Sequence, residues 1–198
     1  MKRIVLASNN AGKVREFQRL FAPLHIEIVP QGDLGVPEAE EPHVTFLENA
    51  LAKARHASTL TGMPALADDS GICVSALNGA PGVYSARYAG PPKSDERNNL
   101  KLLDALSGVA DRRAFYYAVL VMVRHGDDPR PLIAEGRLDG EILLAPRGEG
   151  GFGYDPLFYL SALGNTVAEL TPEEKNPISH RGRALASLLA RMAEEGQV

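Results

Sequence analysis

The N-terminal stretch up to Val29 limits the fold most strongly, because its apolar pattern changes period twice. Residues 4–7, Ile-Val-Leu-Ala, form a continuous apolar run of the kind found in buried strands. After a polar turn at 8–13, apolar residues recur at helical spacing as far as Phe21, and Pro23 ends that pattern. Residues 26–29 return to a strand pattern. A β-loop-α-β unit of this kind predicts an α/β fold.

The rest of the chain continues this alternation. The pattern predicts further helices at residues 45–60 and 94–106, one from Thr171 and a last one after Ser179. Further strands are expected at residues 65–69, 113–124, 131–134 and 138–144, with loops at 31–43, 78–82 and 148–153. We therefore expect a mixed central sheet flanked by helices, formed as a single domain over residues 1–198 that can be bilobal.

The composition argues against several classes of protein. A formal net charge of −4 argues against a general nucleic-acid or membrane-surface binder, so neither partner is expected. Cys73 is the only cysteine, which leaves no internal disulfide and no cysteine-based zinc cluster. The apolar run at 4–7 is too short for a signal peptide or a membrane span. A cytoplasmic protein is therefore the expectation.

The first candidate for chemistry is the pair of adjacent carboxylates Asp68 and Asp69. The apolar residues 65–67 precede them and Ser70-Gly71 follows, so the pattern predicts a strand that ends by delivering acids to the edge of the sheet. Ligands bind at that edge in open α/β sheets. Adjacent carboxylates repel, and a divalent cation or a cationic ligand would compensate them. An acidic turn after a strand is the alternative.

Two other polar segments could serve a phosphate-bearing ligand. The turn 8–13 lies between a strand and a helix, where backbone N–H groups can point at a phosphate and Lys13 would add charge. It lacks the glycine spacing of a Walker A loop, and an ordinary β-α turn would look the same. The second segment is the acidic loop with Glu38, Glu40 and Glu41, followed by a helix on which Asn49 and Lys53 share a face. A solvated loop and lysine are the alternative there.

Two C-terminal segments could bind a flat, polar ligand. Residues 150–156, Gly-Gly-Phe-Gly-Tyr-Asp-Pro, allow close backbone approach and leave an aromatic ring to stack, although a turn with two packed aromatics fits equally. Lys175 and Ser179-His180-Arg181 gather basic groups at a helix start, where cations are unfavourable. A solvated basic patch is the alternative. Together the segments provide the inventory of a nucleoside triphosphate site.

These motifs resemble those of the inosine/xanthosine triphosphate pyrophosphatases, which remove deaminated purine nucleotides. The matching segments run in family order across nearly the whole chain, at residues 8–13, 45–50 with 53–54, 67–71, 79–88, 151–156 and 179–182. The resemblance implies a Mg²⁺-dependent hydrolase, usually a homodimer, that converts a nucleoside triphosphate to the monophosphate and pyrophosphate. It also implies a mixed sheet with helices, split into two lobes by a long substrate cleft.

The resemblance also implies roles for residues at matching positions. Asp69 is implied as the general base and a metal ligand, with Glu40 as the second ligand and Glu41 and Asp68 as further candidates. The implied substrate-binding residues are Ser8, Asn9, Asn10, Ala11, Gly12, Lys13, Lys53, Ser70, Phe152, Gly153, Tyr154, Asp155, Lys175, His180 and Arg181.

Two departures from the family pattern leave questions open. Pro42-His43 follows Glu41 where the family usually has Thr-Gly, so the choice between Glu40 and Glu41 is undecided. Pro177 is a local variation that could shift Lys175.

Selectivity can be argued from hydrogen-bond polarity. Hypoxanthine and xanthine carry a 6-oxo acceptor where adenine carries an amino donor, whereas Lys175, Arg181 and protonated His180 are donors. Adenine would leave buried donors unpaired at roughly 1–3 kcal/mol each. Guanine shares the 6-oxo group, so position 2 of the base would have to exclude it, which is a hypothesis.

Other functions fit part of the pattern. A related pyrophosphatase for pyrimidine or modified nucleotides would share the acids, although residues 179–181 favour the purine class. A non-catalytic nucleotide-binding protein would not need the carboxylates beside Lys13 and Lys53. A plain α/β interaction module would leave the polar segments unexplained. The preference among ITP, dITP and XTP stays open.

Overall fold

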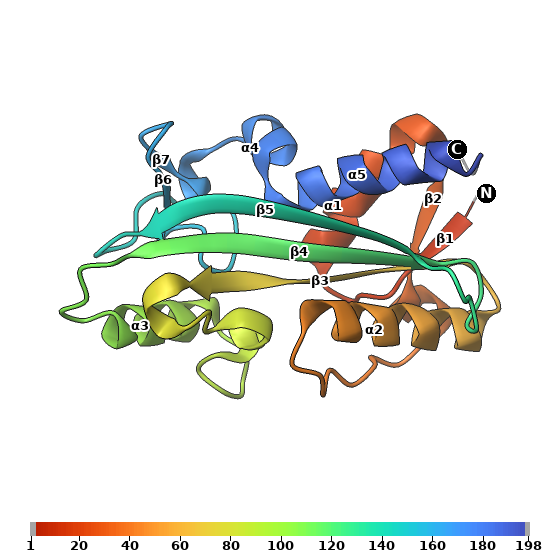
Figure 1. The fold of residues 1–198 in the computed structure, drawn as a ribbon, viewed down its shortest axis with the longest axis horizontal. Helices are drawn as coiled ribbons and strands as arrows, with labels where there is room; N and C mark the ends of the chain where they lie inside the picture. Colours follow the sequence, from red (N-terminus) through yellow and green to blue (C-terminus); the bar gives the residue numbers. More distant parts are fainter. Residues whose placement is uncertain (1–2, 197–198) are drawn as a thin grey trace. The chain divides into compact units, whose positions relative to one another are not determined.

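The computed structural model describes residues 3–196, in which α-helices and strands alternate as far as Val123 (Figure 1). The strands are β1 (Arg3–Leu6), β2 (Glu27–Pro30), β3 (Ala65–Val74), β4 (Arg113–Val123), β5 (Leu132–Ile142), β6 (Phe158–Leu160) and β7 (Asn165–Thr166). The helices are α1 (Ala11–Phe21), α2 (Phe46–Thr61), α3 (Asp95–Ala105), α4 (Pro172–Ile178) and α5 (His180–Glu194).

The strands form a seven-stranded mixed sheet in the order β2-β1-β3-β4-β5-β6-β7. β1 pairs in parallel with both β2 and β3, with Val5 opposite Val29 and Ala65. The β5-β6 and β6-β7 pairs are antiparallel. β1 is covered on both faces, since Ile4, Val5 and Leu6 are fully buried, as their apolar run predicted. The α/β class and the mixed sheet flanked by helices are therefore confirmed.

Two strand predictions were wrong in extent. β3 does not end at the acids: it continues through Asp68 and Asp69 to Val74, because apolar residues from Ile72 onward resume the buried pattern. The two short strands expected at 131–134 and 138–144 are one strand, β5, in which buried and exposed residues continue to alternate across Glu135 and Arg137. Charged residues on the outward face of a strand do not interrupt its pairing.

The chain divides into two compact units. Unit 1 comprises the described residues up to Asp69, with Val119–Glu135 and the described residues from Ala184 onward. In this unit α2 lies on one face of the sheet, and α1 and the greater part of α5 lie on the other (Figure 1). Unit 2 comprises Ser70–Ala118 and Gly136–Arg183. Its core includes fully buried Leu102, Leu157 and Phe158. Among the described residues, no helix has the length and apolar character required to cross a bilayer.

Side-chain caps start the helices where the sequence predicted. Thr45 accepts a hydrogen bond from the Glu48 N–H at 3.2 Å and starts α2. Thr171 begins α4 with a full capping box and Pro172 at the first position. Ser179 Oγ accepts from the Gly182 N–H at 3.0 Å in the first turn of α5. These caps satisfy N–H groups that a helix start leaves without a backbone partner.

The connection between β4 and β5 is organised by the buried carboxylate of Asp128. Arg124 donates to its two oxygens through Nε at 2.8 Å and Nη2 at 2.5 Å. The backbone N–H groups of Arg124 and Arg130 donate as well, each at 2.9 Å. The hydrogen bonds from Arg124 hold the pKa of Asp128 well below its usual range. A paired, hydrogen-bonded carboxylate of this kind stabilises the folded state when it is ionised.

We predict that Asp128→Asn lowers the free energy of unfolding by about 1–3 kcal/mol near pH 7, measured by urea denaturation. The folded-state pKa lies below the unfolded value of about 3.9, so the stabilisation is present above that value and is lost as the pH falls toward the folded-state pKa. The difference from wild type should therefore shrink below about pH 4. Asp127→Asn removes an exposed carboxylate and is the matched control. A difference that does not change with pH would contradict the prediction.

Candidate active site

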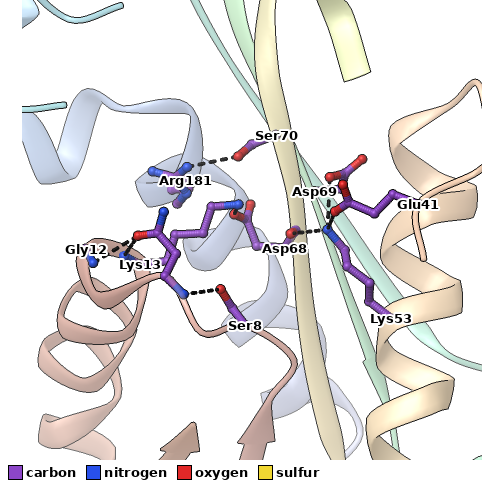
Figure 2. A network of polar contacts seen from close by, with 10 residues as sticks. Ser8, Gly12, Lys13, Glu41, Lys53, Asp68, Asp69, Ser70 and Arg181 are labelled. Atoms are coloured by element: carbon purple, nitrogen blue, oxygen red, sulfur yellow. Dashed lines mark hydrogen bonds and ion pairs between the residues drawn. The ribbon is translucent and has the colours of Figure 1, made fainter. Parts of the chain in front are cut away.

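Asp68 and Asp69 lie in the middle of β3, and their side chains point to opposite faces of the sheet (Figure 2). Successive residues of a strand alternate in this way, so the two neighbouring carboxylates meet different side chains. Each meets a different lysine: Asp68 meets Lys13, and Asp69 meets Lys53. The expectation of acids at a strand end is therefore replaced by two separate ion pairs.

On one face, the Lys53 ammonium joins Asp69 to the acidic loop. Lys53 reaches down from α2 and donates to Glu41 Oε1 at 2.7 Å, Asp69 Oδ1 at 3.0 Å and the Asp68 carbonyl oxygen at 3.0 Å. Its three hydrogens are thus all used. The group of two carboxylates and one ammonium keeps a net negative charge, so it can attract a further cation.

Burial changes the protonation of this group. It raises the pKa of the Asp69 carboxyl above the ordinary value, against the opposing effect of the Lys53 ammonium. Burial alone would lower the pKa of Lys53, but the charges of Asp69 and Glu41 outweigh it and raise that pKa. A carboxylate with a raised pKa accepts a proton more readily, and this is the property that a general base needs.

On the other face, Lys13 pairs with Asp68. Lys13 Nζ lies 2.6 Å from Asp68 Oδ2, and the Asp68 side chain is fully buried whereas Lys13 is 17% exposed. Lys13 belongs to the first turn of α1, which follows β1 after a short turn. The lysine expected to bind phosphate therefore neutralises a buried acid here, and its side chain stays partly exposed.

The turn 8–13 differs from the phosphate cradle that its sequence suggested. Asn10 is the N-cap of α1, and its Oδ1 accepts from the N–H groups of Gly12 at 2.9 Å and Lys13 at 3.1 Å. Those two N–H groups are satisfied within the helix start, as N-cap chemistry dictates. Ser8 Oγ accepts from the Asn10 N–H, and Asn9 and Ala11 are exposed.

The acidic loop is held so that Glu41, and not Glu40, faces Asp69. Asn49 of α2, which is 1% exposed, accepts from the His43 N–H at 3.0 Å and donates to the His43 carbonyl at 3.2 Å. This double contact fixes the loop two residues beyond Glu41. Glu40 is exposed. The Pro42-His43 variation is thus accommodated by backbone hydrogen bonds that Asn49 provides.

A divalent cation fits at the Asp69 side of β3. Asp69 Oδ2 is buried without a hydrogen-bond partner, and such an oxygen is costly unless a ligand or proton compensates it. No group of three or more His, Cys, Asp or Glu residues with metal-binding geometry occurs among residues 3–196. Two carboxylates are the donor set that Mg²⁺ commonly takes from protein when substrate phosphates and water complete its shell.

In unit 2, Asp155 organises the glycine-rich loop. Its Oδ2 accepts from Lys175 Nζ at 2.7 Å and from the Phe152 N–H at 3.1 Å. A Cβ at Gly151 would lie 2.2 Å from the same oxygen, and Gly151 also has a φ of +75°, so only glycine fits there. Lys175 keeps this contact although Pro177 lies in the same helix.

The two aromatic rings of this loop have different environments. Phe152 is 41% exposed, with Lys175 Nζ 4.8 Å and the Arg181 guanidinium 5.5 Å from its ring centre. Tyr154 is buried and donates to the Ser85 carbonyl at 2.7 Å, so it packs the core and is not free to stack. Gly153 lies between them. Phe152 is therefore the ring that could stack on a base.

Arg181 and His180 begin α5, and both are almost fully buried. Arg181 Nη2 donates to Ser70 Oγ at 2.9 Å, so it contacts the residue that follows Asp69 in β3 (Figure 2). The His180 imidazole stacks on the Tyr116 ring, with centres 4.8 Å apart and planes at 15°. These basic groups are therefore not a solvated patch.

Sequence reasoning missed three residues that hold these groups in place. Tyr116 of β4 donates its hydroxyl to Asp155 Oδ1 at 3.1 Å. Asp95 and Asn99 of α3 bond the two backbone groups of Gly153, the first accepting from its N–H at 2.7 Å and the second donating to its carbonyl at 2.9 Å. The partners are 39 to 58 residues apart in sequence, so no local pattern could have identified them.

We predict that Asn49→Leu loosens the acidic loop. The change removes both hydrogen bonds to His43 and places an apolar side chain of similar size in the buried position. The His43 amide should exchange its hydrogen about tenfold faster or more, as expected from the loss of about 1–2 kcal/mol of local stability. Arg55→Leu, on the exposed face of α2, is the control. Equal exchange rates at His43 in both variants would contradict this role.

Comparisons with known proteins identify the family of this chain. The chain matches the Ham1 family over residues 4–191. A protein from Nitrosomonas europaea called dITP/XTP pyrophosphatase is 66% identical over 198 residues, which is 100% of this chain and 98% of that protein. One from Ralstonia nicotianae with the same name is 66% identical and covers 97% of each chain.

Solved structures give the same result. A HAM1 protein from Coxiella burnetii superposes with a TM-score of 0.92 at 49% identity, over 98% of this chain and 100% of that one. A nucleoside-triphosphatase / dITP/XTP pyrophosphatase from Mycobacterium abscessus gives a TM-score of 0.76 at 43% identity, over 94% and 98% of the two chains. Since sequence and fold agree along nearly its full length, the chain belongs to the Ham1 family.

Proposed function

We propose that this protein hydrolyses deaminated purine nucleoside triphosphates, namely ITP, dITP and XTP, to the monophosphate and pyrophosphate, and so removes them from the nucleotide pool. The observation that carries the proposal is the buried Asp69 carboxylate, which shares Lys53 with Glu41 and keeps one oxygen without a partner. The relatives are called dITP/XTP pyrophosphatases and are matched over 97–98% of their length, which supports dITP and XTP as substrates.

The chain's residues account for the steps of this hydrolysis. Asp69 takes a proton from a water molecule as the water oxygen bonds to the α-phosphorus, and the bond from that phosphorus to the pyrophosphate oxygen breaks. Its raised pKa suits it to this role. Lys53 and Lys13 supply ammonium groups that stabilise the negative charge of the departing pyrophosphate. Ser70 is the next residue of the strand and offers a hydroxyl.

Mg²⁺ fits this site, and Glu41 with Asp69 would hold it. When bound, the ion neutralises phosphate charge and makes a coordinated water more acidic. Glu41 is preferred over Glu40 because its carboxylate contacts Lys53 beside Asp69. Asp68 points to the other face of β3 and is paired with Lys13, so it is not part of this ligand set.

The proposal gives recognition of the base to residues of unit 2. Phe152 offers an exposed ring for stacking, and Lys175, His180 and Arg181 are donors that a 6-oxo purine can satisfy. Adenine, with an amino group at that position, would leave donors unpaired. Discrimination against guanine would depend on the 2-amino group, as the sequence suggested. Comparable efficiency on GTP and ITP would overturn that part.

Because the motifs resemble those of the pyrophosphatase family, we also propose that the protein forms a homodimer and acts in the cytoplasm. Light scattering coupled to size exclusion would measure the mass, for which a dimer of the 21.3 kDa chain is expected. A monomer at working concentration would reject the dimer without affecting the chemistry.

We predict that Asp69→Asn reduces pyrophosphate release from ITP by at least about 100-fold, since the amide cannot take the proton. Release would be followed from ITP, XTP, GTP, ATP and dTTP, with Mg²⁺ and then with EDTA. Of these nucleotides, wild type should hydrolyse ITP and XTP, and it should do so with Mg²⁺ but not with EDTA. Asp127→Asn, which removes an exposed carboxylate, should retain wild-type rates.

Each other outcome would identify a different function. Activity on dTTP in place of the purines would indicate a pyrimidine-type pyrophosphatase. Binding without turnover of any nucleotide would indicate a nucleotide-binding protein. Turnover retained in Asp69→Asn would remove Asp69 from the role of base.

Glu41 and Glu40 are neighbours of equal charge and so form a matched pair. We predict that Glu41→Gln raises the Mg²⁺ concentration for half-maximal activity by about tenfold or more, because a neutral amide is a weaker ligand than a carboxylate. Glu40→Gln should leave it nearly unchanged, since that side chain is exposed. The reverse result would assign the metal to Glu40.

A further inference from the structure

Tyr116 has no role in the proposed chemistry, yet it contacts Asp155 and His180, two residues that the family resemblance implies in substrate binding. It lies in β4 and is 7% exposed. Its hydroxyl donates to Asp155 Oδ1 at 3.1 Å, and its ring stacks on the His180 imidazole. One side chain thus links the glycine-rich loop to the start of α5.

The Tyr116 hydroxyl occupies the second oxygen of the Asp155 carboxylate. That carboxylate is 3% exposed, and Lys175 and the Phe152 N–H occupy its other oxygen. Burial, and next the charge of Asp155, raise the pKa of Tyr116 well above its usual value, so the hydroxyl stays protonated as a donor. With both oxygens engaged, the carboxylate has one orientation, and the Lys175 ammonium is held at the end of this chain of contacts.

The ring of Tyr116 restrains the orientation of the His180 imidazole by stacking. The imidazole and phenol planes differ by 15°, and Phe158 packs near the same tyrosine, with ring centres 4.4 Å apart. Phe158 is fully buried in the core of unit 2. The stacked rings therefore pack against the core of unit 2. Because a close-packed core leaves little room for a ring to move, the plane of the imidazole is fixed.

We propose that Tyr116 is a positioning residue that sets the selectivity for the base, by fixing Lys175 through Asp155 and His180 through ring stacking. The inference rests on the proposed function, in which Lys175 and His180 bind the base. Tyr116 need not contact the nucleotide. A donor displaced by a fraction of an ångström weakens its hydrogen bond to the 6-oxo group, whereas a nucleotide without that group loses nothing.

Two substitutions separate the two ends of the side chain. Tyr116→Phe removes only the hydroxyl and leaves the ring against His180. Tyr116→Leu removes both contacts. Tyr159→Phe is the control, because it deletes the hydroxyl of a half-buried tyrosine in β6, whose ring meets Arg147. Thermal unfolding of each variant reports any general loss of folding.

The experiment measures kcat and KM for ITP and for ATP in wild type and the three variants, with the affinity for inosine monophosphate by calorimetry. In Tyr116→Phe the ratio of kcat/KM for ITP to that for ATP should fall about tenfold, which equals about 1.4 kcal/mol, mainly through KM for ITP. The affinity for inosine monophosphate should weaken by a similar factor. Tyr116→Leu should lose more, and Tyr159→Phe should match wild type.

The outcomes separate the inference from the function on which it rests. An unchanged ratio and affinity in Tyr116→Phe would overturn the inference while leaving the function standing. An equal loss on ITP and ATP would also overturn it, because it indicates a merely structural role. If wild type itself shows no preference for ITP over ATP, the proposed function fails first, and the calorimetric comparison still decides whether Tyr116 affects inosine binding.

Discussion

Successive residues of β3 point to opposite faces of the sheet, and this alternation separates Asp68 from Asp69. Two neighbouring carboxylates are costly to bury in the ionised form unless cations compensate them. Lys13 and Lys53 provide these cations from α1 and α2, the two α-helices that precede β3 along the chain. Each of these helices therefore contributes a lysine that neutralises an acid of one strand, and these are the two lysines proposed to stabilise the pyrophosphate.

The cost of this arrangement indicates its purpose. A buried ion pair is seldom more stable than a well-packed apolar pair, because removing the charges from water offsets their attraction. Here the group also leaves Asp69 Oδ2 without a partner. A protein has no reason to keep an unsatisfied buried carboxylate for stability, whereas a base or metal ligand needs an available oxygen. The energetics thus favour a catalytic reading of Asp69 over a structural one.

In unit 2 the contacts restrain the orientation of the hydrogen-bond donors that the proposed function assigns to the nucleobase. Asp155 gathers Lys175, Tyr116 and the Phe152 N–H around one carboxylate. Asp95 and Asn99 restrain the backbone of Gly153 from α3. Flexible glycines are thereby held by contacts from β4, α3 and α4. A loop with this many restraints can present a fixed set of donors, and selectivity for an oxo group over an amino group requires that fixed set.

Local sequence patterns predicted much of the fold of this protein. The apolar runs, helical spacings and capping side chains act over a few residues, so they predicted the α/β order and the starts of α2, α4 and α5. The motifs also provided the acids, lysines and basic residues of the proposed site. The sequence predicted β3 and β5 in the wrong extent, because strand pairing with remote segments sets where a strand ends, and it left the choice between Glu40 and Glu41 open. The choice of Glu41 depends on Asn49 holding His43, and the role of Tyr116 depends on a carboxylate 39 residues away. Burial and hydrogen bonding between remote segments are set only when the chain packs, because a linear pattern carries the period of each element but not its neighbours.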